Sequence, residues 1–261
     1  MTSNTSDNIV CIIPSRYESS RFPGKPLADL CGKPMILHVY ERVRHSNIVS
    51  LVAVATDDRR IYDTVLAFGG RAVLTAAVHP SGTDRIHEAA TLLHLADEDI
   101  VVNIQGDQPL FNPIQIEEVV RPLRDDPAIP MSTLIYRIVR DEEIGHPNAV
   151  KTVFDHDGFA LYFSRATVPY VRDKDKTADY YKHHGIYAYR RHFLRTFASL
   201  PVGKLERLEA LEQLRALEYG FKIKVIETLH DSVEVDTPAE LERVRRLLLR
   251  EDTKGKRDGQ K

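Results

Sequence analysis

Three cationic side chains gather within ten residues near the start of the chain, in the stretch IIPSRYESSRFPGKPL (residues 12–27). Arg16, Arg21 and Lys25 follow an apolar run, and Gly24 directly precedes the lysine. Arginine offers forked donors to phosphate oxygens, lysine supplies a compact charge, and glycine lets a ligand approach the backbone closely. This pattern favours a polyphosphate cradle over a solvated loop whose charges have no ligand.

The same stretch does not match the P-loop of nucleoside triphosphatases. A P-loop needs a Ser or Thr after its lysine to reach Mg²⁺. Here Pro26 follows Lys25, and proline has neither a hydroxyl nor a backbone N–H. The cradle must therefore belong to another kind of nucleotide-binding fold.

Two aspartates are candidate ligands for a metal ion. Asp107 follows an apolar run in NIQGDQP, and Asp236 precedes a predicted helix in VDTP. Carboxylate oxygens are typical ligands of Mg²⁺. The alternatives are a turn residue for Asp107 and a helix N-cap for Asp236. Because 129 positions separate the two (236 − 107), only the fold can bring them together.

Composition excludes several classes of protein. The chain has 261 residues, 43 % hydrophobic and 28 % charged, with a formal net charge of −2, which argues against general nucleic-acid binding. Cys11 and Cys31 are too few for a disulfide framework. No apolar run approaches the roughly 18 residues of a membrane span, and the polar N-terminus lacks the apolar core of a signal peptide. We therefore expect a cytoplasmic protein that binds neither nucleic acid nor membrane.

Strands and helices alternate through the first half of the chain. The apolar runs 9–13, 48–56, 71–75 and 99–105 predict buried strands, and amphipathic helices are expected from 34, at 59–70, at 83–96 and at 113–124. This order indicates a doubly wound α/β fold with a mostly parallel sheet covered on both faces. Such sheets bind ligands beyond the carboxyl ends of their strands, where the cationic loop and Asp107 fall.

The second half is less regular. It predicts strands at 131–139, 149–155 and 159–165, a polar loop at 171–182, and a strand at 185–190. Helices at 191–199 and 206–218, a strand at 222–228 and a closing helix at 237–251 follow. We expect a single domain over 9–250 with a smaller inserted sheet and dimerisation region at about 131–190, and disordered tails at 1–8 and 251–261.

Several blocks together resemble one enzyme family. The opening loop, with SGTDR, VVNIQGDQP, HHGIYAYR, LEALEQLRALEYG and VDTPAELERV, resembles the 3-deoxy-manno-octulosonate (Kdo) cytidylyltransferases, in order from about residue 9 to residue 248. The resemblance implies a fold of the nucleotide-diphospho-sugar transferase type. It also implies the reaction of CTP with Kdo to give CMP-Kdo and pyrophosphate, for lipopolysaccharide synthesis, by a homodimer.

The resemblance also assigns roles to individual residues. Catalytic roles fall to Arg16, Lys25 and Asp107, and Mg²⁺ ligation falls to Asp107 and Asp236. The residues expected to contact CTP are Ser15, Arg16, Arg21, Lys25, Ser81, Gly82, Thr83, Arg85 and Gln105. The residues expected to contact Kdo are Gln105, Arg165, His183, Tyr187, Glu212 and Gln213. On the residues alone, Ser81 or Thr83 could instead cap a helix, and Glu212 could be a solvated helix residue.

One position departs from the family pattern and keeps the substrate open. The family usually reads QGDEP, whereas this chain has Gln108 in place of Glu. The change removes a negative charge beside the predicted metal site, so 8-amino-Kdo remains an alternative to Kdo. A sialic acid is disfavoured by the later blocks. A metal-dependent glycosyltransferase is disfavoured because no D-x-D motif follows a strand. A protein that binds CTP without catalysis is the remaining alternative.

Overall fold

The computed structural model describes residues 8–18, 21–79, 81–173 and 175–258, with side chains described as far as residue 250. Its centre is a nine-stranded sheet in which seven strands follow the order β11-β7-β10-β6-β1-β4-β5, and β8 and β9 extend from β10. The strands are β1 (Ile9–Ser15), β4 (Leu51–Thr56), β5 (Ala72–Leu74), β6 (Ile100–Asn103), β7 (Met131–Arg137), β8 (Lys151–Phe154), β9 (Ala160–Ser164), β10 (Tyr181–Arg190) and β11 (Lys224–Glu227).

The sheet is mostly parallel, as the alternation of strands and helices predicted. β1 pairs parallel with β4 and β6, β4 pairs parallel with β5, and β7 pairs parallel with β11. The exception is β10, which runs antiparallel to both β6 and β7. Antiparallel insertion of β10 brings the 183–187 segment beside the carboxyl end of β6, so its side chains can reach the same edge of the sheet.

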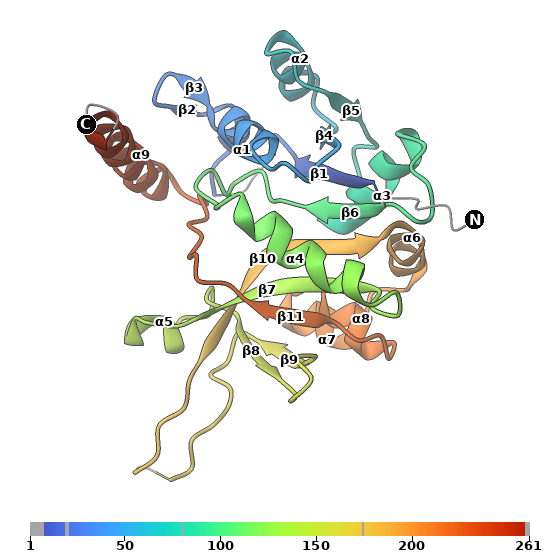
Figure 1. The fold of residues 1–261 in the computed structure, drawn as a ribbon, viewed down its shortest axis with the longest axis vertical. Helices are drawn as coiled ribbons and strands as arrows, with labels where there is room; N and C mark the ends of the chain where they lie inside the picture. Colours follow the sequence, from blue (N-terminus) through green and yellow to red (C-terminus); the bar gives the residue numbers. More distant parts are fainter. Residues whose placement is uncertain (1–7, 19–20, 80, 174, 259–261) are drawn as a thin grey trace.

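Helices cover both faces of the sheet (Figure 1). The helices are α1 (Met35–Arg44), α2 (Arg59–Ala67), α3 (Gly82–Leu92), α4 (Ile114–Asp125), α5 (Asp141–Ile144), α6 (Arg191–Ser199), α7 (Lys204–Glu209), α8 (Leu214–Glu218) and α9 (Pro238–Asp258). Alternate residues of β1 point to opposite faces. Ile9, Cys11 and Ile13 pack with α1, α2 and α4, whereas Val10 and Ile12 pack with α3, α6 and α8.

A third, smaller cluster holds α9 against the start of the chain. Leu30, Met35 and Val235 pack with Leu241 and Val244 of α9, and all five are nearly or fully buried. A short 3-10 helix η1 (Lys25–Leu27) and a two-stranded sheet of β2 (Asp29–Leu30) and β3 (Lys33–Pro34) complete this corner. This packing brings the segment before α9 next to the cationic opening loop, although the two lie at opposite ends of the sequence.

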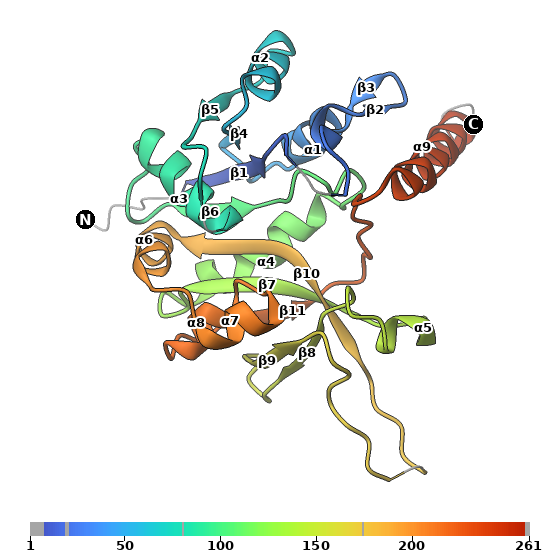
Figure 2. The same ribbon diagram turned by 180° about the vertical axis from the view of Figure 1, so that it is seen from behind.

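The second half differs from expectation in three places. Within 131–190, β7 and β10 belong to the central sheet, and β8 and β9 form a hairpin attached to the end of β10. The predicted helix 206–218 is split, because Ala210 adopts the left-handed conformation at φ 50° between α7 and α8. The segment between β9 and β10 projects from the molecule (Figure 2), and β10 begins earlier than predicted, at Tyr181.

The C-terminal segment also departs from its prediction. We expected 251–261 to be disordered, but α9 continues through Asp258. Charged residues such as Glu, Lys and Arg are good helix formers, so a polar segment can continue a helix. The predicted N-terminal tail lies outside the described residues except for Asn8. No helix in the described part of the chain combines the length and apolar character needed to cross a membrane.

Candidate active site

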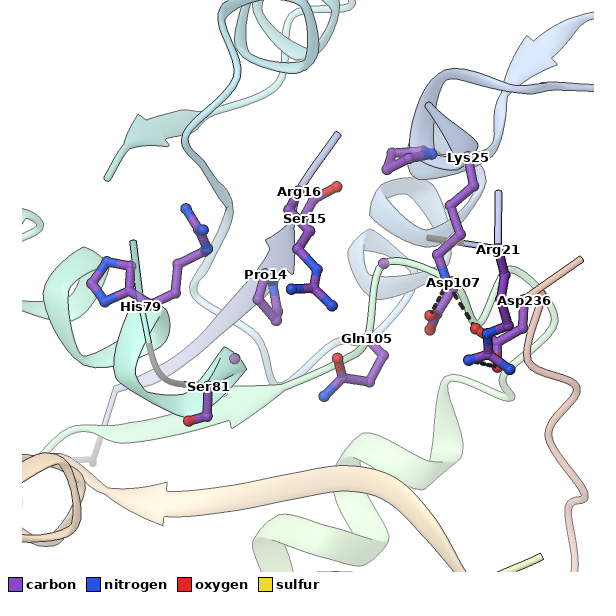
Figure 3. Close-up of a pocket in the computed structure, with 14 residues that line it drawn as sticks. Pro14, Ser15, Arg16, Arg21, Lys25, His79, Ser81, Gln105, Asp107 and Asp236 are labelled. Carbon is purple, nitrogen blue, oxygen red and sulfur yellow. Dashed lines mark hydrogen bonds and ion pairs between the residues drawn. The ribbon is translucent and has the colours of Figure 1, made fainter. Parts of the chain in front are cut away.

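A cavity of about 350 Å³ opens where the parallel strands end (Figure 3). Its walls come from four separate segments: the end of β1 with the opening loop, the start of α3 with the loop before it, the loop after β6, and the segment before α9. The residues that line it are Pro14, Ser15, Arg16, Arg21, Lys25, Pro26, His79, Ser81, Gly82, Arg85, Gln105, Gly106, Asp107 and Asp236. Ten of these were predicted from the sequence, which confirms that the fold brings the separate motifs together.

Lys25 bridges the two aspartates that were predicted as metal ligands. Its Nζ lies 2.6 Å from Asp107 Oδ2 and 3.1 Å from Asp236 Oδ1. Arg21 adds a second cation, with its NH2 at 2.9 Å from Asp236 Oδ2. Desolvation opposes the charge on Lys25, but the two carboxylates outweigh it and raise the pKa of the ammonium. The aspartates, 129 positions apart in sequence (236 − 107), thus form one cation-binding pair.

Main-chain contacts fix the position of Asp236. The amide of Val235 donates to Asp107 O at 2.9 Å, and Lys25 Nζ donates to Val235 O at 3.1 Å. Asp236 does not cap α9, contrary to one expectation. Thr237 and Glu240 form a capping box instead: Thr237 Oγ1 accepts from Glu240 N, while Glu240 Oε2 accepts from Thr237 N at 2.8 Å. The Asp236 carboxylate therefore remains available to the pocket.

The opening loop is shaped by a glycine that no other residue could replace without strain. Gly24 has φ 72°, and a β-carbon there would lie 2.9 Å from the Tyr17 hydroxyl. Its amide donates to Tyr17 O at 2.8 Å. On its other side the Tyr17 ring carries the Arg60 guanidinium, 3.3 Å from the ring centroid. This stacking supports the loop from which η1 begins at Lys25, and the Lys25 side chain faces the pocket.

Gly106 and Ser15 lie where the ends of β6 and β1 approach each other. A β-carbon on Gly106 would lie 3.1 Å from Pro14 O, so only glycine allows the loop after β6 to approach the end of β1 this closely. Ser15 is buried, and its hydroxyl has no hydrogen-bond partner among the described residues. A buried hydroxyl without a partner at a pocket wall is a candidate ligand contact.

The N-terminus of α3 forms the opposite wall. Ser81 caps the helix by accepting from Asp84 N at 3.3 Å, so this hydroxyl has the capping role considered from the sequence. Arg85 is buried and donates to Thr75 Oγ1 at 2.6 Å, with Asp57 at 3.4 Å. The first turn of α3 brings the backbone of Gly82 to the cavity wall, and the N-terminus of a helix favours an anionic ligand.

The sequence reading missed His79. It lines the cavity, and its Nε2 lies 2.5 Å from Glu88 Oε2. Glu88 also accepts from Ala76 N at 2.9 Å, which ties the loop to α3. A histidine two residues before Ser81 of the SGTDR block was a visible signal, but its partner lies nine residues later on the helix. Only the helix geometry shows that the two meet.

Comparisons with known proteins agree with this geometry. Residues 10–225 match the family model described as cytidylyltransferase. The chain belongs to the cytidylyltransferase family. A 3-deoxy-manno-octulosonate cytidylyltransferase of Syntrophus aciditrophicus is 71 % identical over 243 residues, covering 93 % of this chain and 98 % of the relative. An 8-amino-3,8-dideoxy-manno-octulosonate cytidylyltransferase of Shewanella amazonensis is 55 % identical, covering 90 % and 96 %.

A solved structure supports the same family. A CMP:2-keto-3-deoxy-manno-octonic acid synthetase complexed with CTP superposes on this cytidylyltransferase with a TM-score of 0.88 and 46 % identity, covering 94 % of this chain and 100 % of the other. The family and the fold predicted from the sequence blocks are both confirmed. Membership does not test the individual site residues, so their roles rest on the geometry.

Among the predicted sugar residues of this cytidylyltransferase, His183 and Tyr187 lie in a row along β10, outside the cavity lining. The ring of His183 is 5.2 Å from that of Tyr187, which stacks on Tyr189 at 5.6 Å. Tyr189 OH meets Thr83 Oγ1 at 3.4 Å, and Thr83 donates to Glu212 Oε1 at 2.7 Å. Burial lowers the pKa of His183 to about 3, so its imidazole is neutral. Glu212 is thus held at the break before α8 and is not a solvated helix residue.

Two predicted sugar residues lie apart from this row. Arg165 donates to the carbonyls of Glu209 at 2.6 Å and Pro147 at 3.0 Å, so its guanidinium joins β9 to α7 and the loop before β8. Gln213 is buried, and its Nε2 has no partner among the described residues. The structure does not bring Arg165 to the cavity, and its contact with the sugar carboxylate stays a prediction.

Proposed function

We propose that this cytidylyltransferase transfers CMP from CTP to the anomeric hydroxyl of Kdo and releases pyrophosphate. The observation that carries the proposal is the meeting of Lys25 with Asp107 and Asp236 at the carboxyl edge of the sheet, in a pocket that also holds Arg16 and Arg21. The 71 % identity to a Kdo cytidylyltransferase and the superposition on a CTP-bound synthetase support the substrates.

The cationic residues act by binding and orienting the triphosphate. Arg16 and Arg21 provide forked donors, and the N-terminal turn of α3 provides the backbone N–H of Gly82. Lys25 places a point charge where negative charge builds up on the α-phosphate oxygens as the hydroxyl attacks. Nucleotidyl transfer of this kind is accelerated mainly by positioning and charge stabilisation, so no covalent nucleophile of the protein is required.

The two aspartates fit a hard cation such as Mg²⁺. They present oxygen donors to a single cationic point, now met by Lys25 Nζ, and Mg²⁺ commonly uses one or two carboxylates together with substrate phosphates. When bound, Mg²⁺ supplies charge neutralisation to the phosphates. Asp107 and Asp236 would hold it, and Lys25 would then turn from the carboxylates toward the phosphates.

The row along β10 is proposed to bind the sugar. Neutral His183 and the hydroxyl of Tyr187 can exchange hydrogen bonds with sugar hydroxyls, and Glu212 lies at the far end of the row. Gln105 connects the two parts, because it lines the cavity and also lies beside Gly185 of β10. Placed in this way, Gln105 can contact both the nucleotide and the sugar.

We further propose that the chain acts as a homodimer in the cytoplasm and supplies CMP-Kdo for lipopolysaccharide synthesis. These proposals follow from the resemblance to the family. Analytical ultracentrifugation tests the oligomeric state: a single species near the mass of one chain, 29.7 kDa, would refute the dimer.

The substrate is tested by pyrophosphate release from the purified protein with CTP and Mg²⁺, with Kdo or 8-amino-Kdo added in parallel. Release with Kdo supports the proposal. Release with the amino sugar alone favours the second candidate, which Gln108 and the relatives from Shewanella keep open. CTP binding without release in either reaction would retain the nucleotide site and refute the catalytic assignment.

A further inference from the structure

A carboxylate that no sequence motif singled out lies beside the candidate active site. Gln108 Nε2 donates to Glu234 Oε1 at 3.1 Å, across 126 positions of sequence. Gln108 is fully buried, whereas Glu234 is exposed to solvent. No hydrogen-bond partner of Glu234 Oε2 occurs in the described part of the chain. The protein therefore fixes one oxygen of the carboxylate and leaves the other without a partner among the described residues.

The position of Glu234 is set by its neighbours in the chain. Val235 is buried in the cluster under α9, and its backbone N–H and C=O are bound by Asp107 and Lys25. Exposure alternates across this segment, from exposed Glu234 through buried Val235 to half-buried Asp236. Glu234 therefore lies next to the backbone that holds Asp236 at the pocket, although it is not among the residues that line the cavity.

Glu234 also faces the strand that carries the sugar candidates. A β-carbon built on Gly185 would lie 3.5 Å from Gln105 Cγ, 3.8 Å from Gln108 Nε2 and 3.9 Å from Glu234 Oε1. Gly185 stands between His183 and Tyr187 in β10. Figure 3 places Asp236 at the end of the cavity away from His79 and Ser81. Glu234 is thus at the junction of the metal pair and the sugar row, remote from the α3 wall.

Gln108 suits this arrangement better than the Glu of the family pattern. A Glu at position 108 would set two carboxylates against each other, which is unfavourable at hydrogen-bonding distance. The amide donates to Glu234 instead and fixes one of its oxygens. The substitution that looked like a lost charge in the sequence is therefore coupled to a carboxylate on another segment.

We propose that Glu234 is a specificity-determining residue of the sugar site: its free oxygen accepts a hydrogen bond from a donor group of the acceptor sugar, and Gln108 positions it. This inference rests on the proposed function. A carboxylate here repels phosphate and the carboxylate of the sugar, so it must face a hydrogen-bond donor. That donor is a hydroxyl in Kdo, and in 8-amino-Kdo it can also be the ammonium.

The test compares Glu234→Ala and Glu234→Gln with the wild-type protein and with Glu227→Gln, a matched change at an exposed glutamate of β11 outside the site. Steady-state KM values are measured separately for CTP, Kdo and 8-amino-Kdo. We expect Glu234→Ala to raise the KM for the sugar about tenfold, because a lost hydrogen bond weakens recognition of its partner. The KM for CTP and all constants of Glu227→Gln should change less than about twofold.

The Gln variant identifies the donor. If Glu234→Gln lowers kcat/KM for 8-amino-Kdo far more than for Kdo, the carboxylate pairs with the ammonium; similar losses point to a hydroxyl. Both results support the proposal. An unchanged sugar KM in Glu234→Ala overturns it. The proposal is also overturned if Glu234→Ala changes only the Mg²⁺ concentration needed for half-maximal activity. The carboxylate would then act in metal binding and not in sugar binding.

The positioning role of Gln108 is tested in a double-mutant cycle. Gln108→Ala should raise the sugar KM less than Glu234→Ala does, and it should add nothing when Glu234 is already alanine. Additive effects would contradict positioning through Glu234.

Calorimetric titration with CTP confirms that each variant is folded. Failure of wild-type protein to release pyrophosphate with either sugar would refute the proposed function, whereas an active wild type with an unaffected Glu234→Ala would refute this inference alone.

Discussion

Two charged clusters in this molecule contain the same kinds of side chain but have different roles. The pocket cluster consists of Arg21, Lys25, Asp107 and Asp236, with side chains exposed by 14 % to 56 %. The internal cluster consists of Asp84, Glu206 and Arg215, with side chains exposed by 1 % to 10 %. In the first, the charges remain open to solvent and to a ligand. In the second, they are sealed inside the protein.

The geometry of the internal cluster explains why it is structural. Arg215 binds Glu206 through two parallel hydrogen bonds of 2.8 Å and 2.7 Å, and its guanidinium lies 4.7 Å from the centroid of the Phe197 ring. Asp84 of α3 completes the set at 3.5 Å. Every charge has a fixed partner, so the cluster joins α3, α6, α7 and α8. A binding site requires the opposite: its charged side chains must be able to exchange their partners in the protein for groups of a substrate.

The largest effect expected from this comparison is on stability. Arg215→Ala should lower the free energy of unfolding by about 3–5 kcal/mol, because it leaves buried carboxylates without their counter-ion. Urea unfolding followed by circular dichroism measures the change. The exposed pair Arg195–Asp97 is the control, and Arg195→Ala should change the free energy of unfolding little, because solvent screens an exposed pair. Equal effects of the two changes would remove the distinction between sealed and open charges.

The next effect is on catalysis. Lys25→Ala should lower kcat about 100-fold while changing the KM for CTP little, because its charge acts mainly on the transition state. Steady-state kinetics at saturating sugar measures both constants. Lys33→Ala, at an ion pair with Glu41 outside the cavity, is the matched control. An unchanged kcat in Lys25→Ala would show that the pocket cluster has another purpose.

A smaller catalytic effect is expected from the backbone that supports the pocket cluster. Gly106→Ala places a β-carbon 3.1 Å from Pro14 O and 3.2 Å from Ile36 Cδ1, so the loop carrying Asp107 must shift. We expect about a tenfold loss of kcat/KM with a change in melting temperature of only a few degrees. Gly145→Ala meets no atom within 4 Å and should leave both unchanged. Comparable losses in both variants would contradict the role of close approach.

The smallest effect concerns a third set of charges, at Asp231. Desolvation opposes the Asp231 carboxylate, but hydrogen bonds from His184 and Lys182 outweigh it and hold its pKa well below the ordinary value of 3.8. Since the folded-state pKa is depressed, this stabilisation is present above pH 3.8 and is lost as the pH falls below it.

Asp231→Asn should therefore cost about 1 kcal/mol at pH 7, after allowance for its partial exposure, and progressively less toward pH 3. Unfolding in urea at a series of pH values measures the difference between the two proteins. A difference that grows on acidification would have the wrong sign and would exclude this account of Asp231.

Local patterns predicted much of the fold and of the nucleotide pocket. The apolar run ending at Ser15 and the blocks at Ser81 and Asp107 identified strand ends and loops, because continuous apolar strands between amphipathic helices belong to a parallel sheet. Arg16 and Lys25 were identified by residue type and spacing within one loop. Each of these signals lies within a few residues of sequence, where covalent connection already limits the geometry.

Other features depended on contacts between distant segments. His79 gained its role from Glu88, and Thr237 replaced Asp236 as the cap of α9 through Glu240. Ala210 broke a predicted helix because packing around Arg215 outweighed helix propensity. Arg165 was expected at the sugar and instead donates to backbone carbonyls of Glu209 and Pro147. No short-range pattern carries this information.

The sequence by itself determined the class of fold, the family, and the residue types available at each strand end, because these follow from hydrophobic period and local motif. The tertiary structure alone decided which charges meet. Asp107 reaches Lys25 and Asp236, and Gln108 reaches Glu234, only because α9 returns to the opening loop through the buried contacts of Val235. Hydrogen bonds act over about 3 Å and charge interactions in salt solution over roughly 10 Å, so both depend on distance in space and not on separation along the chain.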